Sequence, residues 1–265
     1  MKKETEQKLA RSLTAETTEL LPFLPYLYQD FWELGSSPAD IIALLQKHVS
    51  LTEGFRVLDL ACGKGAVSIQ LAKAFGVRAR GFDLMPGFVE DAAQKAKEWG
   101  VDALCNFHHA DVNDAARTER GYDCVIFGAA GNVLGDPQET LQKLSRTVKP
   151  RGYLVMDDAY LRDSALPEDV QYDYDYLTRS QWLRLFDDNG LRLVEELPAC
   201  EVQDFDDDNR AIALRVGELI AKHPEKRAMF EGFAQSQLNE CADLNHNLVG
   251  VTWLLQRVYS KLPIH

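Results

Sequence analysis

The stretch Arg56 to Lys73, RVLDLACGKGAVSIQLAK, constrains the fold of this chain more than any other. Its apolar run from Val57 to Leu60 has the composition of a buried strand, and the small-residue turn Ala61 to Gly65 follows at once. From Ala66 onward the apolar residues recur at a spacing compatible with a helix. The pattern therefore predicts a strand, a glycine turn and a helix in direct succession.

This glycine turn is suited to a ligand that approaches the backbone closely. Glycine permits positive φ and removes the Cβ atom, and the first amides of the next helix favour a carboxylate or a phosphate. Two common nucleotide motifs do not fit the letters. The dinucleotide fingerprint G-x-G-x-x-G needs a third glycine that C-G-K-G-A-V lacks, and no Lys-Ser or Lys-Thr pair completes a phosphate-binding loop.

Acidic residues follow the next two predicted strands. The strand 77–84 ends at Asp83, roughly 20 residues after the turn, where a carboxylate can accept both ribose hydroxyls of an adenosine ligand. The strand 103–110 leads into Asp111, which can also cap a short helix that runs to about Arg120. The order of turn and acids predicts an adenosine-containing ligand.

With these acids in place, the chain resembles the class I, Rossmann-like S-adenosylmethionine-dependent methyltransferases of the small-molecule type. Their first motif reads acidic-x-Gly-x-Gly-x-Gly, and this chain has DLACGKG from Asp59 to Gly65, with Ala61 where the family more often has glycine. The resemblance covers roughly 50–200 and 247–260. It implies S-adenosyl-L-methionine as the cofactor, bound by Asp59, Ala61, Gly63, Gly65, Asp83, Leu84, Met85, Asp111, Val112 and Gly128.

The fold class that we expect is α/β, with a seven-stranded Rossmann-like methyltransferase sheet flanked by helices. Further strands are predicted over 122–130, 153–160, 191–198 and 249–258, and the resemblance inserts the last of them between the fifth and the sixth. We expect an N-terminal helical segment over 1–49, a methyltransferase core over 50–202 plus 246–265, and a helical insertion over 203–245. The insertion could be a lid or an oligomer contact.

The N-terminal segment carries its own pattern. Residues 1–15 are polar, and we expect them to be frayed. The segment 20–35 concentrates aromatic residues, and its prolines favour a helix that begins at or after Pro25. Ser37 and Pro38 have the form of an N-cap and a first helical residue. The aromatic residues could face a cationic sulfonium, although packing onto the sheet is the more common role.

Candidate catalytic residues lie at the end of the fifth predicted strand. Asp157 and Tyr160 close that strand at the edge that faces the ligand crevice, although a solvated acidic cap is an equal alternative. Gly128 and alanines stand where metal-dependent relatives need an acid, so no metal is expected. Methyl transfer by in-line displacement can rely on proximity and alignment, and a base is needed only where the nucleophile is protonated at neutral pH.

Composition excludes several partners. Acidic residues outnumber basic ones by 41 to 29, which argues against nonspecific nucleic-acid binding. No run approaches the ~18 apolar residues of a membrane span, and the first residues lack the apolar core of a secretory signal. We therefore expect a cytoplasmic protein with no membrane partner. The five cysteines stand singly, as small buried hydrophobes do.

The function that the resemblance implies is transfer of a methyl group from S-adenosylmethionine to a small-molecule acceptor, with a homodimer as a candidate assembly. A noncatalytic S-adenosylmethionine-binding module, or another group transfer that uses a derivative of this cofactor, stays open. A nicotinamide-dependent oxidoreductase is disfavoured by the missing third glycine. The acceptor atom, the need for a base, the oligomeric state and the role of the insertion are not decided by the sequence.

Overall fold

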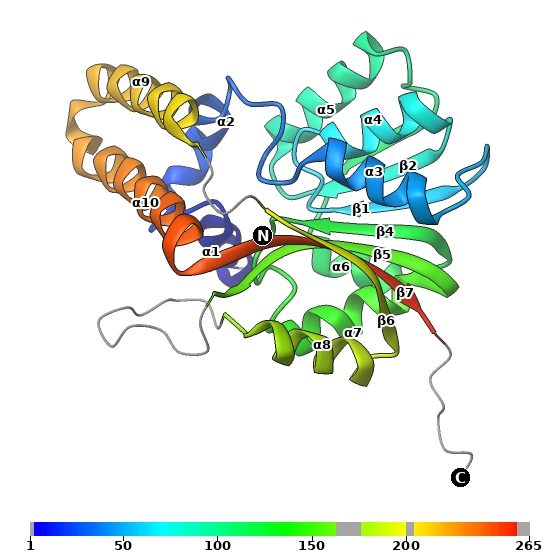
Figure 1. Ribbon diagram of the computed structural model, residues 1–265. Coiled ribbons are helices and arrows are strands. Elements are labelled where there is room, and N and C mark those ends of the chain that lie inside the picture. The colour runs from blue at the N-terminus through cyan, green and yellow to red at the C-terminus, as the bar shows by residue number, and fades with distance from the viewer. Residues whose placement is uncertain (1–2, 163–175, 200–203, 259–265) are drawn as a thin grey trace.

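One seven-stranded sheet forms the centre of the molecule (Figure 1). The computed structural model describes residues 3–162, 176–199 and 204–258. The strand order is β3-β2-β1-β4-β5-β7-β6, in which β7 is antiparallel to both of its neighbours and the other pairs are parallel. This confirms the predicted fold class, including the last strand between the fifth and the sixth. The strands are β1 Arg56–Leu60, β2 Arg78–Asp83, β3 Cys105–His109, β4 Tyr122–Gly128, β5 Val148–Leu161, β6 Leu191–Pro198 and β7 Leu248–Arg257.

Helices cover both faces of this sheet (Figure 1). One layer consists of α3 Pro38–His48, α4 Ala66–Phe75 and α5 Pro86–Glu98, and the other of α6 Val112–Thr118, α7 Pro137–Thr147 and α8 Arg179–Asp188. Four of these helices begin where a side-chain oxygen accepts a hydrogen bond from a first-turn amide, as helix N-termini require. These capping residues are Ser37, Asp111, Asp136 and Thr178.

The fifth strand begins five residues earlier than the sequence predicts, at Val148 instead of Tyr153. Pro150 and Gly152 are residue types that commonly end a helix and interrupt a strand. The chain remains paired because the register between β4 and β5 shifts at this point and Arg151 adopts a φ of 65°. The irregularity is therefore absorbed as a bulge within the strand.

From Lys3 onward the N-terminal residues form helices, so the expectation of a frayed terminus is wrong for the part that the structure describes. They form α1 Lys3–Ser12, the 3-10 helix η1 Thr18–Phe23 and α2 Leu24–Leu27. Helical turns also begin before Pro25, contrary to the prediction, because this proline falls in the first turn of α2, where its missing N–H has no partner to lose. Buried apolar residues in α1 and just after it hold this helix against the protein: Ala10 and Ala15 are each 2% exposed.

A helical hairpin connects β6 and β7 and packs against these N-terminal helices (Figure 1). It consists of α9 Asp206–Lys222, η2 Pro224–Lys226 and α10 Arg227–His246. The shared apolar cluster combines residues of the hairpin, of the N-terminus and of the region that follows β2, among them Ile212, Val216, Leu219, Phe230, Phe233, Leu20, Leu24, Leu27, Met85 and Phe88. The domain boundaries remain a prediction, but the N-terminal segment and the helical insertion contribute to one apolar cluster.

Candidate active site

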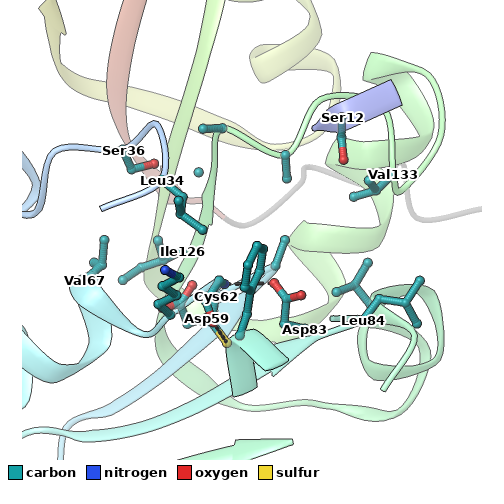
Figure 2. Close-up of a pocket in the computed structure, with 18 of the residues that line it drawn as sticks. Ser12, Leu34, Ser36, Asp59, Cys62, Val67, Asp83, Leu84, Ile126 and Val133 are labelled. Carbon is teal, nitrogen blue, oxygen red and sulfur yellow. Dashed lines mark hydrogen bonds between the residues drawn. The ribbon is translucent and has the colours of Figure 1, made fainter. Parts of the chain in front are cut away.

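A cavity opens where the carboxyl ends of β1, β2 and β4 meet the first residues of α4 and α6 (Figure 2). The space within it, counted out to its open mouth, is about 900 Å³. Eight of the ten residues that the resemblance implies lie on its wall: Asp59, Ala61, Gly63, Asp83, Leu84, Asp111, Val112 and Gly128. The parallel strands explain this convergence, because their carboxyl ends share one edge of the sheet.

Asp83 connects the end of β2 to the glycine turn. Its carboxylate accepts hydrogen bonds from the backbone N–H of Gly63 at 2.8 Å and from that of Met85 at 2.8 Å. Burial raises the pKa of Asp83, and these backbone donors act in the opposite direction. Each carboxylate oxygen has a second lone pair, so the side chain can hold the turn and still accept hydrogen bonds from a ligand.

Asp59 places a second carboxyl group in the same cavity. It is 4% exposed and accepts a hydrogen bond of 2.6 Å from Ser68 Oγ. Burial raises the pKa of Asp59 to about 7, the Ser68 hydroxyl lowers it, and the nearby Asp83 charge raises it. Two enclosed carboxyl groups of this kind favour a ligand that brings positive charge.

The backbone conformation of the turn explains why the family more often has glycine at the position of Ala61. Ala61 has a φ of 61°, a conformation that costs an L-residue ~1–2 kcal/mol. Glycine, which the family more often has there, would adopt it without that cost.

Two residues implied by the resemblance do not lie on the wall. A Cβ at Gly65 would come within 2.7 Å of the Phe107 ring, so this glycine faces the packing between α4 and β3. Met85 is buried in the cluster shared with the N-terminal helices. Both residues adjoin the site in sequence, but a Cβ at Gly65 and the side chain of Met85 lie in the protein interior. Any cofactor contact at these two positions would have to come from the backbone, and it remains a prediction.

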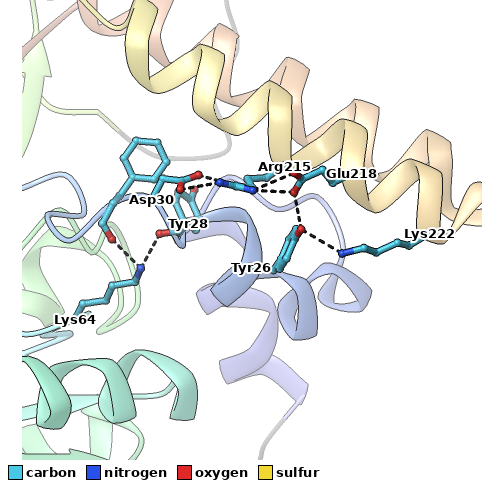
Figure 3. Close-up of polar contacts among 8 residues, drawn as sticks. Tyr26, Tyr28, Asp30, Lys64, Arg215, Glu218 and Lys222 are labelled. Carbon is cyan, nitrogen blue, oxygen red and sulfur yellow. Dashed lines mark hydrogen bonds and ion pairs between the residues drawn. The ribbon is translucent and has the colours of Figure 1, made fainter.

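Lys64 is a site residue that the sequence analysis missed (Figure 3). It is 4% exposed, and its Nζ donates hydrogen bonds to the carbonyls of Tyr28 at 2.6 Å and Phe31 at 2.7 Å. Trp32 Nε1 donates to the carbonyl of Lys64 at 3.1 Å, so side chain and backbone of one turn residue hold the same N-terminal segment. Burial lowers the pKa of Lys64, whereas Asp91 raises it.

The N-terminal segment also supplies one side of the cavity. Leu9, Ser12 and Leu13 come from α1 and the residue after it, and Leu34 and Ser36 come from the segment before α3. Figure 2 shows Ser12, Leu34 and Ser36 across the cavity from Asp59 and Asp83. The apolar spacing of Leu9 and Leu13 within a polar stretch was the one local signal for this wall.

A second, wider cavity adjoins the first, with about 2030 Å³ of space including its open side. Ser12 and Ala129 line both cavities. The segment before α3 alternates, because Leu34 and Ser36 face the first cavity whereas Gly35 and Ser37 face the second. Helix α10 contributes another part of the second wall through Ser236, Asn239, Glu240, Asp243 and Leu244.

The two candidate catalytic residues differ in position. Asp157 lines the second cavity, and its sheet partners are Gly128 on β4 and Thr252 on β7. Tyr160 lines neither of the two cavities, and its ring lies 6.4 Å from that of Trp253. Tyrosines alternate with aspartates in YDYDY, residues 172–176; Tyr172 and Tyr174 lie outside the described residues, whereas Tyr176 lines the second cavity.

The surroundings of Asp157 shift the pKa of its carboxyl group toward neutral pH. The pKa of Asp157 is raised to about 7: burial raises it most, the charges of Asp158 and Asp40 also raise it, and the hydroxyls of Ser36 and Thr252 act in the opposite direction. A carboxyl group with a pKa near the working pH is suited to proton transfer.

Other sequence expectations concern metals, membranes and cysteines. Among residues 3–162, 176–199 and 204–258, no group of three or more His, Cys, Asp or Glu is placed to hold a metal ion. None of the helices in those ranges is long and apolar enough to cross a membrane. Cys105 and Cys124 are buried, Cys62 and Cys241 are partly buried, and Cys200 lies outside the described residues.

Comparison with known proteins identifies the family. Residues 51–196, more than half of the chain, match the model of a methyltransferase domain. The chain belongs to this methyltransferase family. Among its relatives, the uncharacterized protein YjhP of Escherichia coli is 28% identical over 161 residues, which are 58% of this chain and 64% of YjhP. The ubiquinone/menaquinone biosynthesis C-methyltransferase UbiE of Bdellovibrio bacteriovorus is 33% identical over 114 residues, or 42% of this chain and 47% of the relative. These matches span less than two thirds of either relative.

Solved structures extend the likeness of this chain beyond the matched domain. A Thiobacillus denitrificans S-adenosylmethionine-dependent methyltransferase in complex with S-adenosyl-L-homocysteine aligns with a TM-score of 0.74 and 23% identity, covering 88% of this chain and 96% of that one. The [4+2]-cyclase SpnF aligns with a TM-score of 0.69 and 16% identity, covering 91% and 94%. At such identities the likeness establishes the fold, which can host different reactions.

Proposed function

We propose that this chain transfers a methyl group from S-adenosylmethionine to a small-molecule acceptor. The observation that carries the proposal is the pair of adjoining cavities, one lined by the turn and strand-end acids and the other by Asp157 and α10. A methyl donor and an acceptor need such neighbouring sites, because transfer requires the two reactants to be held in contact.

The first cavity has the chemistry that the cofactor requires. Asp83 offers carboxylate oxygens to the ribose hydroxyls, and Asp111 and Val112 would face the adenine. A cationic sulfonium close to Asp59 would favour the charged form of this buried carboxyl group, whose pKa burial raises. A Cβ at Gly128 would lie 2.1 Å from Ser36 Oγ, so glycine lets the segment before α3 approach the end of β4. The family relationship and the S-adenosylhomocysteine-bound neighbour support the same cofactor.

The chain's own residues would act mainly by positioning. The bound cofactor supplies an activated methyl group, while the glycine turn and strand-end acids orient it toward the second cavity. Asp157 is the residue that we propose for holding a proton, since it lines the second cavity and Tyr160 does not. Helix α10 would form the outer wall of the acceptor site, which favours the lid role for the insertion. A homodimer contact remains a prediction.

Calorimetric titration tests the cofactor assignment directly. We expect S-adenosylmethionine and S-adenosylhomocysteine to bind and NADH, the control, not to bind. Radiolabelled methyl transfer to a metabolite panel, measured together with release of S-adenosylhomocysteine, then tests catalysis. Absence of S-adenosylmethionine binding would refute the proposed function, and binding without transfer to any panel member would favour a noncatalytic module.

A further inference from the structure

We propose that the second cavity accepts a cationic amine, whose ammonium group lies against Asp157 and whose nitrogen receives the methyl group. This inference rests on the proposed function, which supplies the methyl donor in the first cavity. It adds the chemical class of the acceptor, and it follows from the charges on the second wall and from the place of Asp157 between the two cavities.

The first argument is the sign of the charges on that wall. Among the described residues, its acidic members are Glu16, Asp40, Asp157, Asp158, Glu240 and Asp243, and its basic member is Arg11. The whole chain has 41 acidic and 29 basic residues, so six to one is a much stronger bias than composition provides. The acids come from four separate parts of the chain: the segment after α1, helix α3, strand β5 and helix α10. A concave wall with charges of one sign concentrates ions of the opposite sign.

The second argument is that several of these charges have no internal counter-ion. On the α9–α10 hairpin, acidic residues outside the cavity wall pair with arginines, as Asp207 does with Arg210 and Glu231 with Arg227. In the part of the chain that the structure describes, Glu16, Asp40 and Asp157 form no ion pair. The wall is therefore left with negative charge that a cationic ligand would neutralise.

The third argument is the position of Asp157 itself. Its strand neighbour Gly128 lines the first cavity, and the backbone N–H of Ala129, which lines both, donates to the Asp157 carbonyl at 3.0 Å. The charge of Asp158 on the same strand and that of Asp40 on α3 act on the carboxyl group, as do the hydroxyls of Ser36 and of Thr252 on β7. Ser36 Oγ is enclosed and close enough to lower the pKa of Asp157, but it forms no hydrogen bond of ordinary geometry with a described residue. A donor-rich ammonium group at this border would have acceptors on both sides.

The chemistry balances with these groups alone. The acceptor's ammonium group gives one proton to the Asp157 carboxylate, which leaves a neutral amine with a free electron pair. That nitrogen forms a bond to the methyl carbon, the carbon–sulfur bond breaks, and sulfur keeps its electron pair as a neutral thioether. The product is a methylated ammonium ion, and Asp157 returns its proton to solvent through the open second cavity. The amine must lose a proton before it attacks, so a group with the character of Asp157 is required here.

The inference is tested by measuring charge preference, which does not require the natural acceptor. Matched ligands that share one skeleton, such as 2-phenylethylamine, 2-phenylethanol and phenylacetate, and an aliphatic set of the same design are titrated by ligand-observed NMR. The protein is measured both free and saturated with S-adenosylhomocysteine. We expect each amine to bind about tenfold to a hundredfold more tightly than its alcohol, as a charge-assisted hydrogen bond provides, and the carboxylates to bind most weakly.

Variants assign the preference to Asp157. Asp157→Asn keeps the shape of the side chain and should bring the amine-to-alcohol ratio close to one, whereas Asp114→Asn on the exposed face of α6 should leave it unchanged. Retained S-adenosylhomocysteine affinity shows that the variant is folded.

The outcomes separate the two proposals. If S-adenosylhomocysteine does not bind the wild-type protein, the proposed function fails, and the ligand series on the free protein still reports the charge preference. If it binds but alcohols or carboxylates bind as well as amines, or no amine binds at millimolar concentration, the amine assignment is overturned and the cofactor assignment stands. An amine preference that survives in Asp157→Asn contradicts the role given to this residue.

Discussion

At the scale of single residues, Asp83 has two roles, and both depend on its carboxylate. It anchors the Gly63 and Met85 amides, and it is the proposed ribose contact. We expect Asp83→Ala to weaken S-adenosylmethionine binding by ~1 to 3 kcal/mol, the usual value for a lost charge-assisted hydrogen-bonding partner, as measured by calorimetry. Asp114→Ala removes an exposed aspartate paired with Arg117 and should leave the affinity unchanged. An unchanged affinity in Asp83→Ala would remove the ribose assignment.

Gly65 belongs to the motif but has a packing role, and a pair of glycines can show this. Gly65 and Gly54 both have positive φ, 73° and 87°, yet an added Cβ meets Phe107 at 2.7 Å in the first and nothing within 4 Å in the second. Gly54→Ala should cost about 1–2 kcal/mol of backbone strain. Gly65→Ala should cost about 1–3 kcal/mol more from overpacking, measured by urea unfolding. Equal losses would show that the Phe107 contact relaxes freely.

Asp157 gives the reaction a pH dependence of defined direction. Because its pKa is raised to about 7, the carboxyl group is protonated at lower pH and can neither attract an ammonium group nor accept its proton. With an amine acceptor, kcat/KM should therefore rise as the pH increases through about 7. Asp157→Asn should lower the rate and abolish this limb of the profile. A limb that persists in the variant would belong to another group.

At the scale of elements, the sequence was most informative where local pattern and tertiary role coincide. The apolar runs of β1 and β4 are buried on both faces of the sheet, and the Ser37 and Asp111 caps are local hydrogen bonds, so short stretches contain the relevant information. Helix α1 was missed because its order depends on apolar contacts with the distant hairpin. The contacts of Lys64 were missed for the same reason, since its acceptors lie 33 and 36 residues earlier. Tertiary context decided these elements.

Lys64 shows how an element is held in place by one buried charge. Lys64→Met keeps the apolar stem and removes the ammonium group that donates to the Tyr28 and Phe31 carbonyls. We expect faster amide hydrogen exchange over residues 24–36 and weaker S-adenosylhomocysteine binding. Lys73→Met provides the control, because Lys73 also donates to a backbone carbonyl, that of Trp99, but at an exposed position. Exchange that is equal in both variants would show that the apolar contacts alone hold the segment.

At the scale of the whole molecule, the cofactor cavity and the late hairpin are joined through the N-terminal segment (Figure 3). Lys64 holds the Tyr28 and Phe31 carbonyls, and Asp30 between them binds Arg215 of α9 through both carboxylate oxygens, at 2.6 and 2.9 Å. Arg215 also donates to Glu218, which accepts from Tyr26. Because these partners lie about 185 residues apart, no local pattern could have revealed the connection. The contacts run without interruption from the glycine turn to the hairpin.

This connection leads to an expectation about the protein as a unit. Binding of S-adenosylhomocysteine should slow amide exchange in the glycine turn, in residues 24–36 and in α9, because ordering one member of the chain of contacts restrains the next. Arg215→Met should abolish the protection of α9 while the turn stays protected. Arg210→Met is the matched control, since Arg210 lies on the same helix and pairs with the exposed Asp207. If the cofactor leaves α9 exchange unchanged in the wild-type protein, the hairpin is an independent wall of the acceptor cavity. Its Asp30–Arg215 contact would then serve stability alone.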